Sequence, residues 1–486
     1  MKNAKQPTSK LKAWLSWLDN NILLLLTGFL LAFIPLYPKL PILDVLPGYI
    51  VRVRIEDFFI LFAFLVWGVQ VLRKKVVFRT PLTFVIIAYC VVGFASSLSA
   101  VYYTYTVPEE YVHVLKMTLH YIRRIEYFSL FFIAYSAIRE RAQLKKLLGI
   151  FCLSALFVSL YGVGQKYLYW PVYSTMNREF SKGLQLYLTE HARVQSTFGG
   201  HYDYAAYLVI VLPVVMAMAF AVRKPWLKVG MWATFIVSLW GLMMTSSRSS
   251  FLAYIVAVGI VIFGMAIKRG WLWGISRTVL IGITTALFLV FFGDLLDRFG
   301  QIFKDNSAYV AIQKTVNDAK IIAKAPIVAV PKNAISVDDV AKAAAKAAVI
   351  DQTDTLPTPV ELPPDVYENI PDKVIRKTPK GEDVVVEVPR VFSDNAKRLG
   401  LSAAIRLDTL WPFAIRGFLR NPLLGSGYST LTKYSNEEFT EAESTDNDFL
   451  RTLGETGALG FVTFYGAMVI ALVFLWRRSH KTADGM

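Results

Sequence analysis

Ten apolar segments of roughly membrane-spanning length constrain the fold of this chain more than any other feature. They lie at about 21–37, 57–72, 81–101, 122–138, 147–168, 202–222, 229–245, 250–267, 272–293 and 456–476. A transmembrane α-helix needs about 20 mostly apolar residues. Hydrophobic residues make up 55% of the chain and charged residues only 18%, a balance that is unusual for a soluble domain. We therefore predict an all-α polytopic membrane protein with about ten transmembrane helices, or up to twelve if weak segments near 40–50 and 403–419 also enter the membrane.

Clusters of basic residues occur in every second connection between these segments. If the N-terminus is cytoplasmic, the clusters that fall on the same side are 73–79, 139–146, 223–228, 268–277 and 477–481. Short cytoplasmic loops carry an excess of Lys and Arg. The pattern predicts a multi-pass protein of the inner membrane with both termini in the cytoplasm. It also accounts for much of the net charge of +16, so we expect a membrane partner and no nucleic acid.

A long connection separates the ninth apolar segment from the last one. We divide the chain into a nine-helix region at 1–293, a periplasmic loop at 294–455, and a last helix with a cytoplasmic tail at 456–486. Within the loop, 304–398 is polar and has as many acidic as basic residues. It contains an Ala-rich tract that suits a helix, a Pro-rich tract that suits an extended chain, and DVVVEVPRVF, which suits a strand. Long loops translocate regardless of charge, and we interpret 304–398 as a decoration or a docking arm rather than a catalytic part.

Arg248 is the first candidate for chemistry, because ionisable residues at helix ends in a membrane protein are costly and often functional. It lies in TSSRSS between two apolar segments, next to Ser246, Ser247, Ser249 and Ser250. An arginine surrounded by hydroxyl and backbone donors suits a phosphate group. The alternative is an arginine that only extends to the membrane interface.

The segment LSAAIRLDTLWPFAIRGFLRNP predicts an amphipathic helix at the far membrane interface. At 100° per residue, one polar face gathers Arg406, Thr409, Arg416 and Arg420. The opposite face is apolar and carries Leu407, Leu410, Ala414 and Phe418. Such a face can bind lipid headgroups or, more specifically, a lipid-linked diphosphate. The turn NPLLGSGYS follows, in which Gly425 and Gly427 permit positive φ or close approach of a ligand.

An acidic run leads into the last apolar segment and ends in Asp446, Asn447 and Asp448. One of these residues would cap a helix that starts near Phe449. A carboxylate beside several arginines could also accept a proton from a sugar hydroxyl. Nothing in the spacing fixes the six to eight oxygen ligands that a calcium site needs, so we expect no metal and no cofactor.

Other ionisable residues have simpler explanations. Arg193 adds a guanidinium group at the same membrane face and is a candidate for substrate binding. The groups at 52–57 and 123–126 contain both signs of charge, and ion pairing among themselves explains them. Four histidines at far-side positions, His113, His120, His191 and His201, are interpreted as incidental.

Four motifs in order resemble the O-antigen ligase and O-antigen polymerase superfamily of bacterial envelopes. They are STFGGHYDYAAYLVIVLP, TSSRSS, RLDTLWPFAIRGFLRNPLLGSGYS with its Arg-x-x-x-x-Trp and Asn-Pro-x-x-Gly-x-Gly patterns, and TDNDFLRTLGETGALGFVTF. The resemblance covers 195–255 and 400–470. It does not extend to 304–398, and the N-terminal helices match only in hydropathy.

The resemblance implies an inverting, metal-independent transfer of a glycan from undecaprenyl diphosphate to a lipid or glycan acceptor at the periplasmic membrane face. By motif, Arg248 and Arg406 would hold the diphosphate, with Arg193, Arg416, Arg420 and Asn447 as further substrate contacts. A ligase usually has His-Asn where this chain has Asp446-Asn447. Asp446 therefore either replaces the histidine as the base, with a different acceptor, or the base lies elsewhere.

Ligase-type transfer is the leading hypothesis, and a polymerase of the same superfamily is the alternative. A transporter of lipid-linked glycans would need polar residues near the middle of the bilayer and matched broken helices, and few such residues occur here. A non-catalytic scaffold that docks partners through 304–398 is the third possibility.

Overall fold

The computed structural model describes residues 10–45, 52–176, 180–189, 192–292, 295, 372–377, 383–388, 405–431 and 445–483. The chain forms two compact units, each considered by itself. The first consists of Met1–Val310 together with Thr409–Met486, and the second is Ala311–Asp408. The AKAAAKAAVI tract and most of the Pro-rich tract lie outside the described residues.

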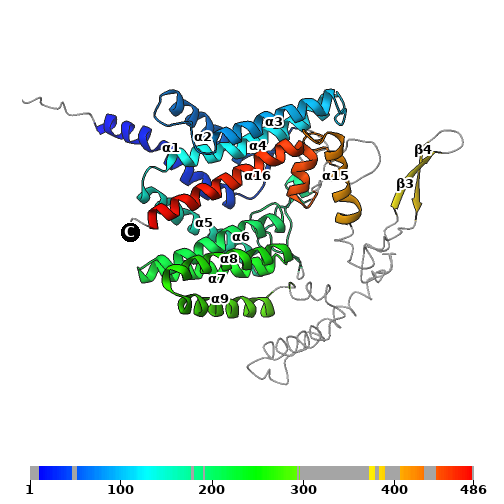
Figure 1. Cartoon of the computed structure of the whole chain (residues 1–486). Coiled ribbons are helices and arrows are strands. Elements are labelled where there is room, and N and C mark those ends of the chain that lie inside the picture. The colour runs from blue at the N-terminus through cyan, green and yellow to red at the C-terminus, as the bar shows by residue number, and fades with distance from the viewer. Residues whose placement is uncertain are drawn as a thin grey trace, which may run out of the picture. The chain divides into compact units, whose positions relative to one another are not determined.

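Each of the ten predicted apolar segments lies in a helix of the first unit (Figure 1). These helices are α1 (Lys10–Leu36), α2 (Ile55–Leu72), α3 (Thr83–Tyr102), α4 (Tyr111–Ala137), α5 (Arg141–Tyr167), α6 (His201–Ala221), α7 (Pro225–Met244), α8 (Arg248–Arg269), α9 (Trp271–Phe291) and α16 (Asp448–Ala483). Within the described residues, nine of them are long and apolar enough to cross a membrane, all but α4. The predicted all-α polytopic fold is confirmed, and the chain is a multi-pass membrane protein.

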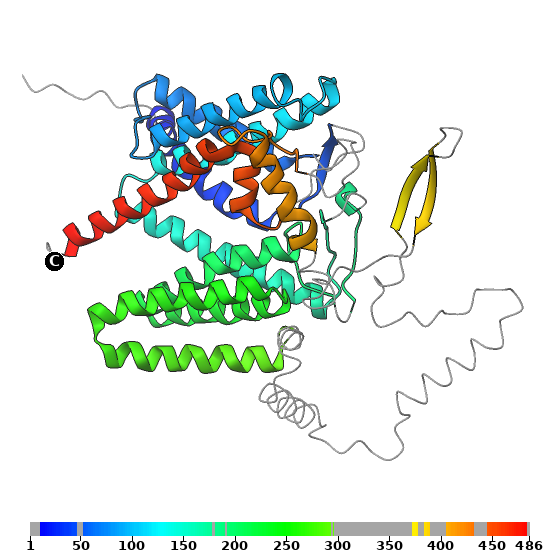
Figure 2. The ribbon, with the colours of Figure 1, turned by 45° about the vertical axis from the view of Figure 1, so that its right-hand side comes forward.

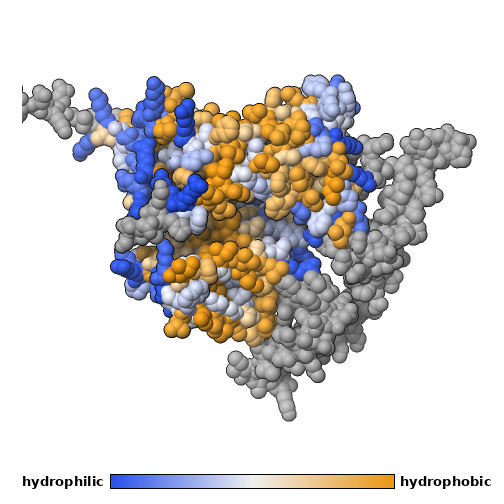
Figure 3. Space-filling view, in the orientation of Figure 1, coloured by the Kyte–Doolittle hydropathy of each residue, from blue (hydrophilic) through white to orange (hydrophobic). Residues whose placement is uncertain are grey.

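Three apolar cores are found among the described residues, and two of them hold most of the helices together. One is centred on α6 and α7, where Leu208, Leu212 and Phe235 are fully buried. The other joins α1, α2 and α4 through residues such as Leu30, Ile60 and Phe132. Figure 3 shows apolar side chains over the middle of the helices and hydrophilic ones toward their two ends, as expected of a membrane protein.

The short elements of the chain are a few turns and strands. A 3₁₀ turn η1 spans Phe180–Lys182, and a π-helical turn η2 (Ile405–Leu410) precedes α15 (Trp411–Arg420). Strands β1 (Pro41–Asp44) and β2 (Arg52–Arg54) pair antiparallel, so the idea of a weak helix near 40–50 is wrong for 41–44. Those residues pair with β2 because the extended backbone there finds its hydrogen bonds across a ribbon. In the second unit, β3 (Asp372–Lys377) and β4 (Asp383–Val388) form a hairpin, and β4 coincides with the predicted strand.

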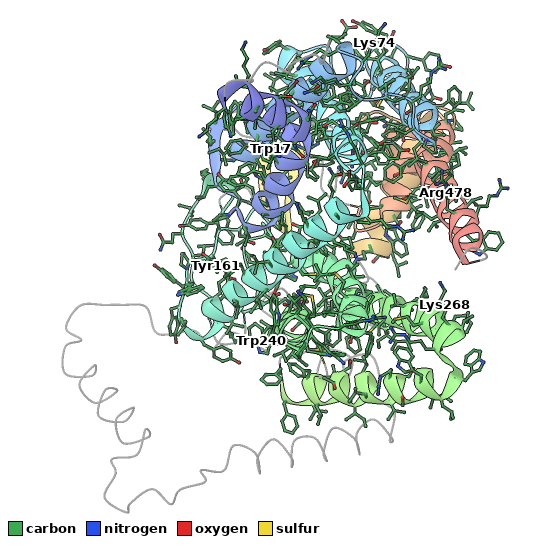
Figure 4. All side chains as sticks on the ribbon, turned by 90° about the vertical axis from the view of Figure 1, so that its left-hand side faces the viewer. Trp17, Lys74, Tyr161, Trp240, Lys268 and Arg478 are labelled. Atoms are coloured by element: carbon green, nitrogen blue, oxygen red, sulfur yellow. The ribbon has the colours of Figure 1, made fainter. Side chains whose placement is uncertain are left out.

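The basic loops and those candidate residues that belong to the first unit occupy opposite ends of it. Figure 4 views it from the end that carries Lys74, Lys268 and Arg478. We call the other end the site end. It contains the first turns of α6, α8 and α16 and the last turn of α3.

The last helix is broken at the site end. Gly457 has φ +65° and ψ −168°, which interrupts α16. In an unbroken helix, the amides of Ala458 and Leu459 would bond the carbonyls of Gly454 and Glu455. Here Ala458 N donates to Pro422 O (2.8 Å) and Leu459 N donates to Leu423 O (3.2 Å).

The freed carbonyls accept bonds from the glycine turn instead. Ser426 N donates to Gly454 O and Gly427 N donates to Glu455 O, both at 2.9 Å. Four backbone bonds therefore join the break in α16 to residues 422–427. Irregular backbone is tolerated in a membrane protein only where protein or water satisfies its polar groups, and the turn supplies that satisfaction.

Glycine is required on both sides of this junction. Gly425 has φ +71°, and a Cβ added there would lie 2.5 Å from the carbonyl carbon of Glu455. A Cβ on Gly457 would collide with the backbone of Leu423 and Leu424. Because the neighbours are backbone atoms, no side-chain movement relieves these clashes.

We expect Gly425→Ala to destabilise the protein by roughly 2 kcal/mol or more, from the left-handed backbone and the clash together. Gly282→Ala in α9 is the matched control, because a Cβ there meets nothing within 4 Å. Thermal unfolding of both purified variants in detergent provides the comparison. Equal midpoints for Gly425→Ala and the wild type would show that the junction is not close-packed.

Candidate functional site

Arg248 begins α8 at the site end, directly after a tight turn. Ser246 has φ +51°, and Ser246 and Ser247 are buried, with exposed fractions of 6% and 3%. The hydroxyl of Ser247 donates to that of Ser250 (2.9 Å). The four serines were expected to surround the arginine. The structure separates them, because Ser246 and Ser247 are buried while Ser249 is exposed.

Arg193 lies on a segment that is tied to the same turn. Val194 N donates to Met244 O (3.1 Å), which brings this segment beside the end of α7, four residues before Arg248. The Nη1 atom of Arg193 lies 2.5 Å from Nε2 of His201 and donates to the Tyr202 hydroxyl (3.3 Å). Neither partner is a carboxylate. His201 is thus a positioning contact for an arginine, although it was interpreted as incidental from the sequence.

Helix α15 is amphipathic, as predicted. Leu410 and Ala414 are buried, whereas Arg416 and Arg420 are exposed; Leu407, expected on the apolar face, is exposed by 37%. The guanidinium of Arg416 lies over the Phe413 ring, 5.2 Å from its centroid. Within the described part of the chain, neither Arg416 nor Arg420 has an ion pair. Helix α15 packs against α16 (Figure 2).

Asn447 caps α16. Its Oδ1 accepts hydrogen bonds from the amides of Phe449 (3.1 Å) and Leu450 (3.2 Å), and its carbonyl accepts one from Arg451 N (2.9 Å). The capping explanation therefore applies to Asn447, and a role in substrate binding stays a prediction. Asp446, the residue before it, is exposed and has φ +51°. Its carboxylate is at the surface of the site end.

The structure places Arg406 only within its own turn. It lies in η2, which leads directly into α15, and it is partly buried. The division between the two units falls between Asp408 and Thr409, so Arg406 belongs to the second unit and is not placed relative to Arg248.

A buried ion pair next to the glycine turn is not among the sequence-based predictions. Glu455 is 3% exposed and accepts hydrogen bonds from Ser429 N (3.1 Å) and from Arg451 Nε (3.3 Å). The signal was present, because Arg451 and Glu455 stand one helical turn apart at the start of an apolar segment. Ser96 Oγ also donates to Glu455 O (2.8 Å), which ties α3 to the break.

Among the residues that the structure describes, no group of three or more His, Cys, Asp or Glu side chains is placed to hold a metal ion. The acidic run at 437–444 lies outside those residues.

Residues 233–465 match the family model described as O-antigen ligase. The matched segment runs from α7 through α8 and α9, the insertion, α15 and the glycine turn to the first half of α16. It contains all the candidate residues except Arg193. The match extends over slightly less than half of the chain, so the similarity to this family is established for this segment alone. Neither the curated proteins nor the solved structures contain a match to the chain.

The capping role of Asn447 leads to a prediction. Asn447→Ala removes the acceptor for two amides of the first turn and should lower the stability by about 1 kcal/mol. Asn447→Asp retains an acceptor oxygen and should stay close to the wild type. Unfolding of the two variants by heat or denaturant measures this difference; identical losses in both would mean that the side chain acts through something other than the cap.

Proposed function

We propose that the protein transfers a glycan from an undecaprenyl-diphosphate donor to an acceptor at the periplasmic membrane face, as an inverting, metal-independent O-antigen ligase. The site end would then face the periplasm and the basic loops the cytoplasm of the inner membrane, in keeping with the positive-inside rule. The observation that carries the proposal is that three arginines at this end, Arg193, Arg416 and Arg420, have no carboxylate partner among the residues that the structure describes.

Arg193, Arg416 and Arg420 have no ion pair within the described residues. A guanidinium group binds a phosphate through two parallel N–H donors. A lipid-linked diphosphate supplies both the negative charge and an apolar chain that stays in the bilayer. Arg248 and Arg406 join this set by motif, as the groups that stabilise the departing diphosphate.

Asp446 is the proposed base for the acceptor hydroxyl. It is exposed at the start of α16 and is held in a strained, left-handed backbone conformation by the cap that follows it. Such strain often occurs at functional positions. A carboxylate in place of the usual histidine favours an acceptor different from that of a typical ligase, and this difference supports the polymerase as the second candidate.

Replacing Arg248 with Gln should lower transfer from a purified lipid-linked glycan by at least 100-fold, because a charged donor to the leaving group is lost. Arg79→Gln, in a basic loop at the opposite end, is the control and should retain full activity. Product formation is followed by gel shift of the labelled glycan. Normal turnover by a folded Arg248→Gln variant would contradict the proposal.

A further inference from the structure

Helices α6 to α9 carry positive charge at the basic end without acids to balance it. Residues 204–293, which contain nearly all of α6 and the whole of α7, α8 and α9, include no Asp and no Glu. The cations at this end are Arg223, Lys224, Lys228, Lys268, Arg269 and Arg277. None of them forms an ion pair with a carboxylate in the part of the chain that the structure describes.

The basic connection at 73–79 provides a contrast at the same end. There, Arg73 Nη1 donates to Asp19 Oδ1 (2.6 Å), and Lys75 also pairs with the Asp19 carboxylate. The positive-inside rule explains why both connections are basic. It does not explain why one of them is paired with an acid of α1 while the other is left open to an external anion.

The turn between α8 and α9 is short and closely packed. A single residue, Gly270, connects the two helices, and its φ of +98° requires glycine. Gly270 N donates to Ala266 O (2.8 Å), and Gly274 N donates to Gly270 O (3.2 Å). A Cβ added to Gly274 would lie 2.5 Å from that of Ala266. The side chains on both sides of the turn are therefore carried by a fixed backbone.

Two arginines of this turn share one indole ring. The guanidinium carbons of Arg269 and Arg277 lie 5.0 Å and 5.8 Å from the centroid of the Trp273 ring. Arg269 Nη2 also donates to Phe220 O at the end of α6 (3.3 Å). The Phe220 ring contacts Trp273 and, on α7, Trp232, with centroids 5.2 Å and 5.1 Å apart. Three helices thus hold the ring on which the two arginines are mounted.

The mounted arginines retain hydrogen-bond donors. A cation–π contact uses the charge of a guanidinium group but none of its N–H donors. Within the described residues, Arg277 makes no hydrogen bond, and Arg269 makes only the one to Phe220. A guanidinium has five donors, in a planar arrangement that matches phosphate oxygens. The pair therefore offers charge and directed donors to a phosphate.

The surface around the pair is apolar, and this favours a lipid over a soluble anion. Phe263, Ile267, Trp271 and Leu272 are exposed by 56%, 64%, 62% and 85%. Figure 3 shows hydrophilic side chains at this end next to the apolar surface of the helices. An anionic phospholipid places its phosphate at the arginines and its acyl chains against these side chains. Inorganic phosphate or an acidic peptide supplies no chain to cover them.

We infer that Arg269 and Arg277, held around Trp273, bind the phosphate of an anionic phospholipid in the leaflet at the basic end. Helix α9 lies at the edge of the bundle and packs against α8 and, less extensively, α7 (Figure 1). The bound lipid adds an anchor for this helix. The site lies at the opposite end from Arg248, so it does not depend on the proposed reaction.

The test is native mass spectrometry of the full chain in detergent, titrated with phosphatidylglycerol or with phosphatidylcholine of the same acyl chains. The wild type should bind the first phosphatidylglycerol roughly tenfold more tightly than the neutral lipid, because only the former offers a net negative charge. Arg277→Gln should weaken phosphatidylglycerol roughly tenfold, since a charge-assisted hydrogen bond is lost. Arg79→Gln, in the other basic connection, is the matched control and should bind as the wild type does.

Arg277→Lys separates a built site from diffuse attraction. Lysine keeps the charge but not the paired donors, so this variant should bind roughly threefold or more weakly than the wild type. Wild-type affinity in Arg277→Lys or in Arg277→Gln, or equal binding of the two lipids by the wild type, would overturn the inference.

Thermal unfolding in detergent without added lipid checks the fold of these variants. Their midpoints should equal that of the wild type, because Arg277 has no hydrogen bond or ion pair within the described residues. Added phosphatidylglycerol should raise the midpoint of the wild type and not that of Arg277→Gln, because a ligand stabilises only the protein that binds it. Equal shifts in both proteins would contradict the site.

Discussion

The exchange of hydrogen bonds between the broken helix α16 and the glycine turn is the interaction on which the site end depends. Two carbonyls and two amides that an unbroken helix would pair internally are paired across to residues 422–427. The exchange sets the position at which α16 resumes after the break. It also holds α15, which precedes the turn, against α16. It is further tied to α3, since Asn421 Nδ2 donates to Ser99 Oγ (3.0 Å) and Thr106 Oγ1 donates to Ser426 O (2.5 Å).

Rigidity of this kind matters because electrostatic catalysis relies on charges that are already in place. The cap of Asn447 and the Arg451–Glu455 pair lie within the short helical segment before the break. A discontinuous helix directs its end groups at a substrate in many membrane proteins. Here Asp446 and Arg451 lie at the start of α16, and Arg416 and Arg420 lie on α15, which packs against it.

The sequence was sufficient to predict the helices because each has an apolar stretch of the right length. The alternation of basic loops placed Lys74, Lys268 and Arg478 at one end. Pattern also identified the amphipathic α15, because Leu410 and Ala414 recur with a helical period. Sequence could not reveal the exchange at Gly457, since the residues that its hydrogen bonds join are 28 to 36 positions apart in the chain.

The same limitation applies to the candidate site. The spacing of Arg451 and Glu455 is visible in the sequence, but the other partners of Glu455, Ser429 and Ser96, come from distant segments. Ion pairing was expected among the charges at 52–57 and 123–126, and Arg123 pairs with Asp57 across these two groups (3.2 Å). Local charge balance in a sequence does not determine which side of a helix each charge occupies.

The central claim is that a glycosidic bond is formed at this site while the lipid diphosphate departs. It is tested most directly by incubating the purified wild-type protein in proteoliposomes with a lipid-linked glycan and an acceptor, and analysing both products by mass spectrometry. The account predicts one released undecaprenyl diphosphate for each new glycosidic bond. Movement of the lipid across the bilayer with the donor intact, and no new bond, would contradict it.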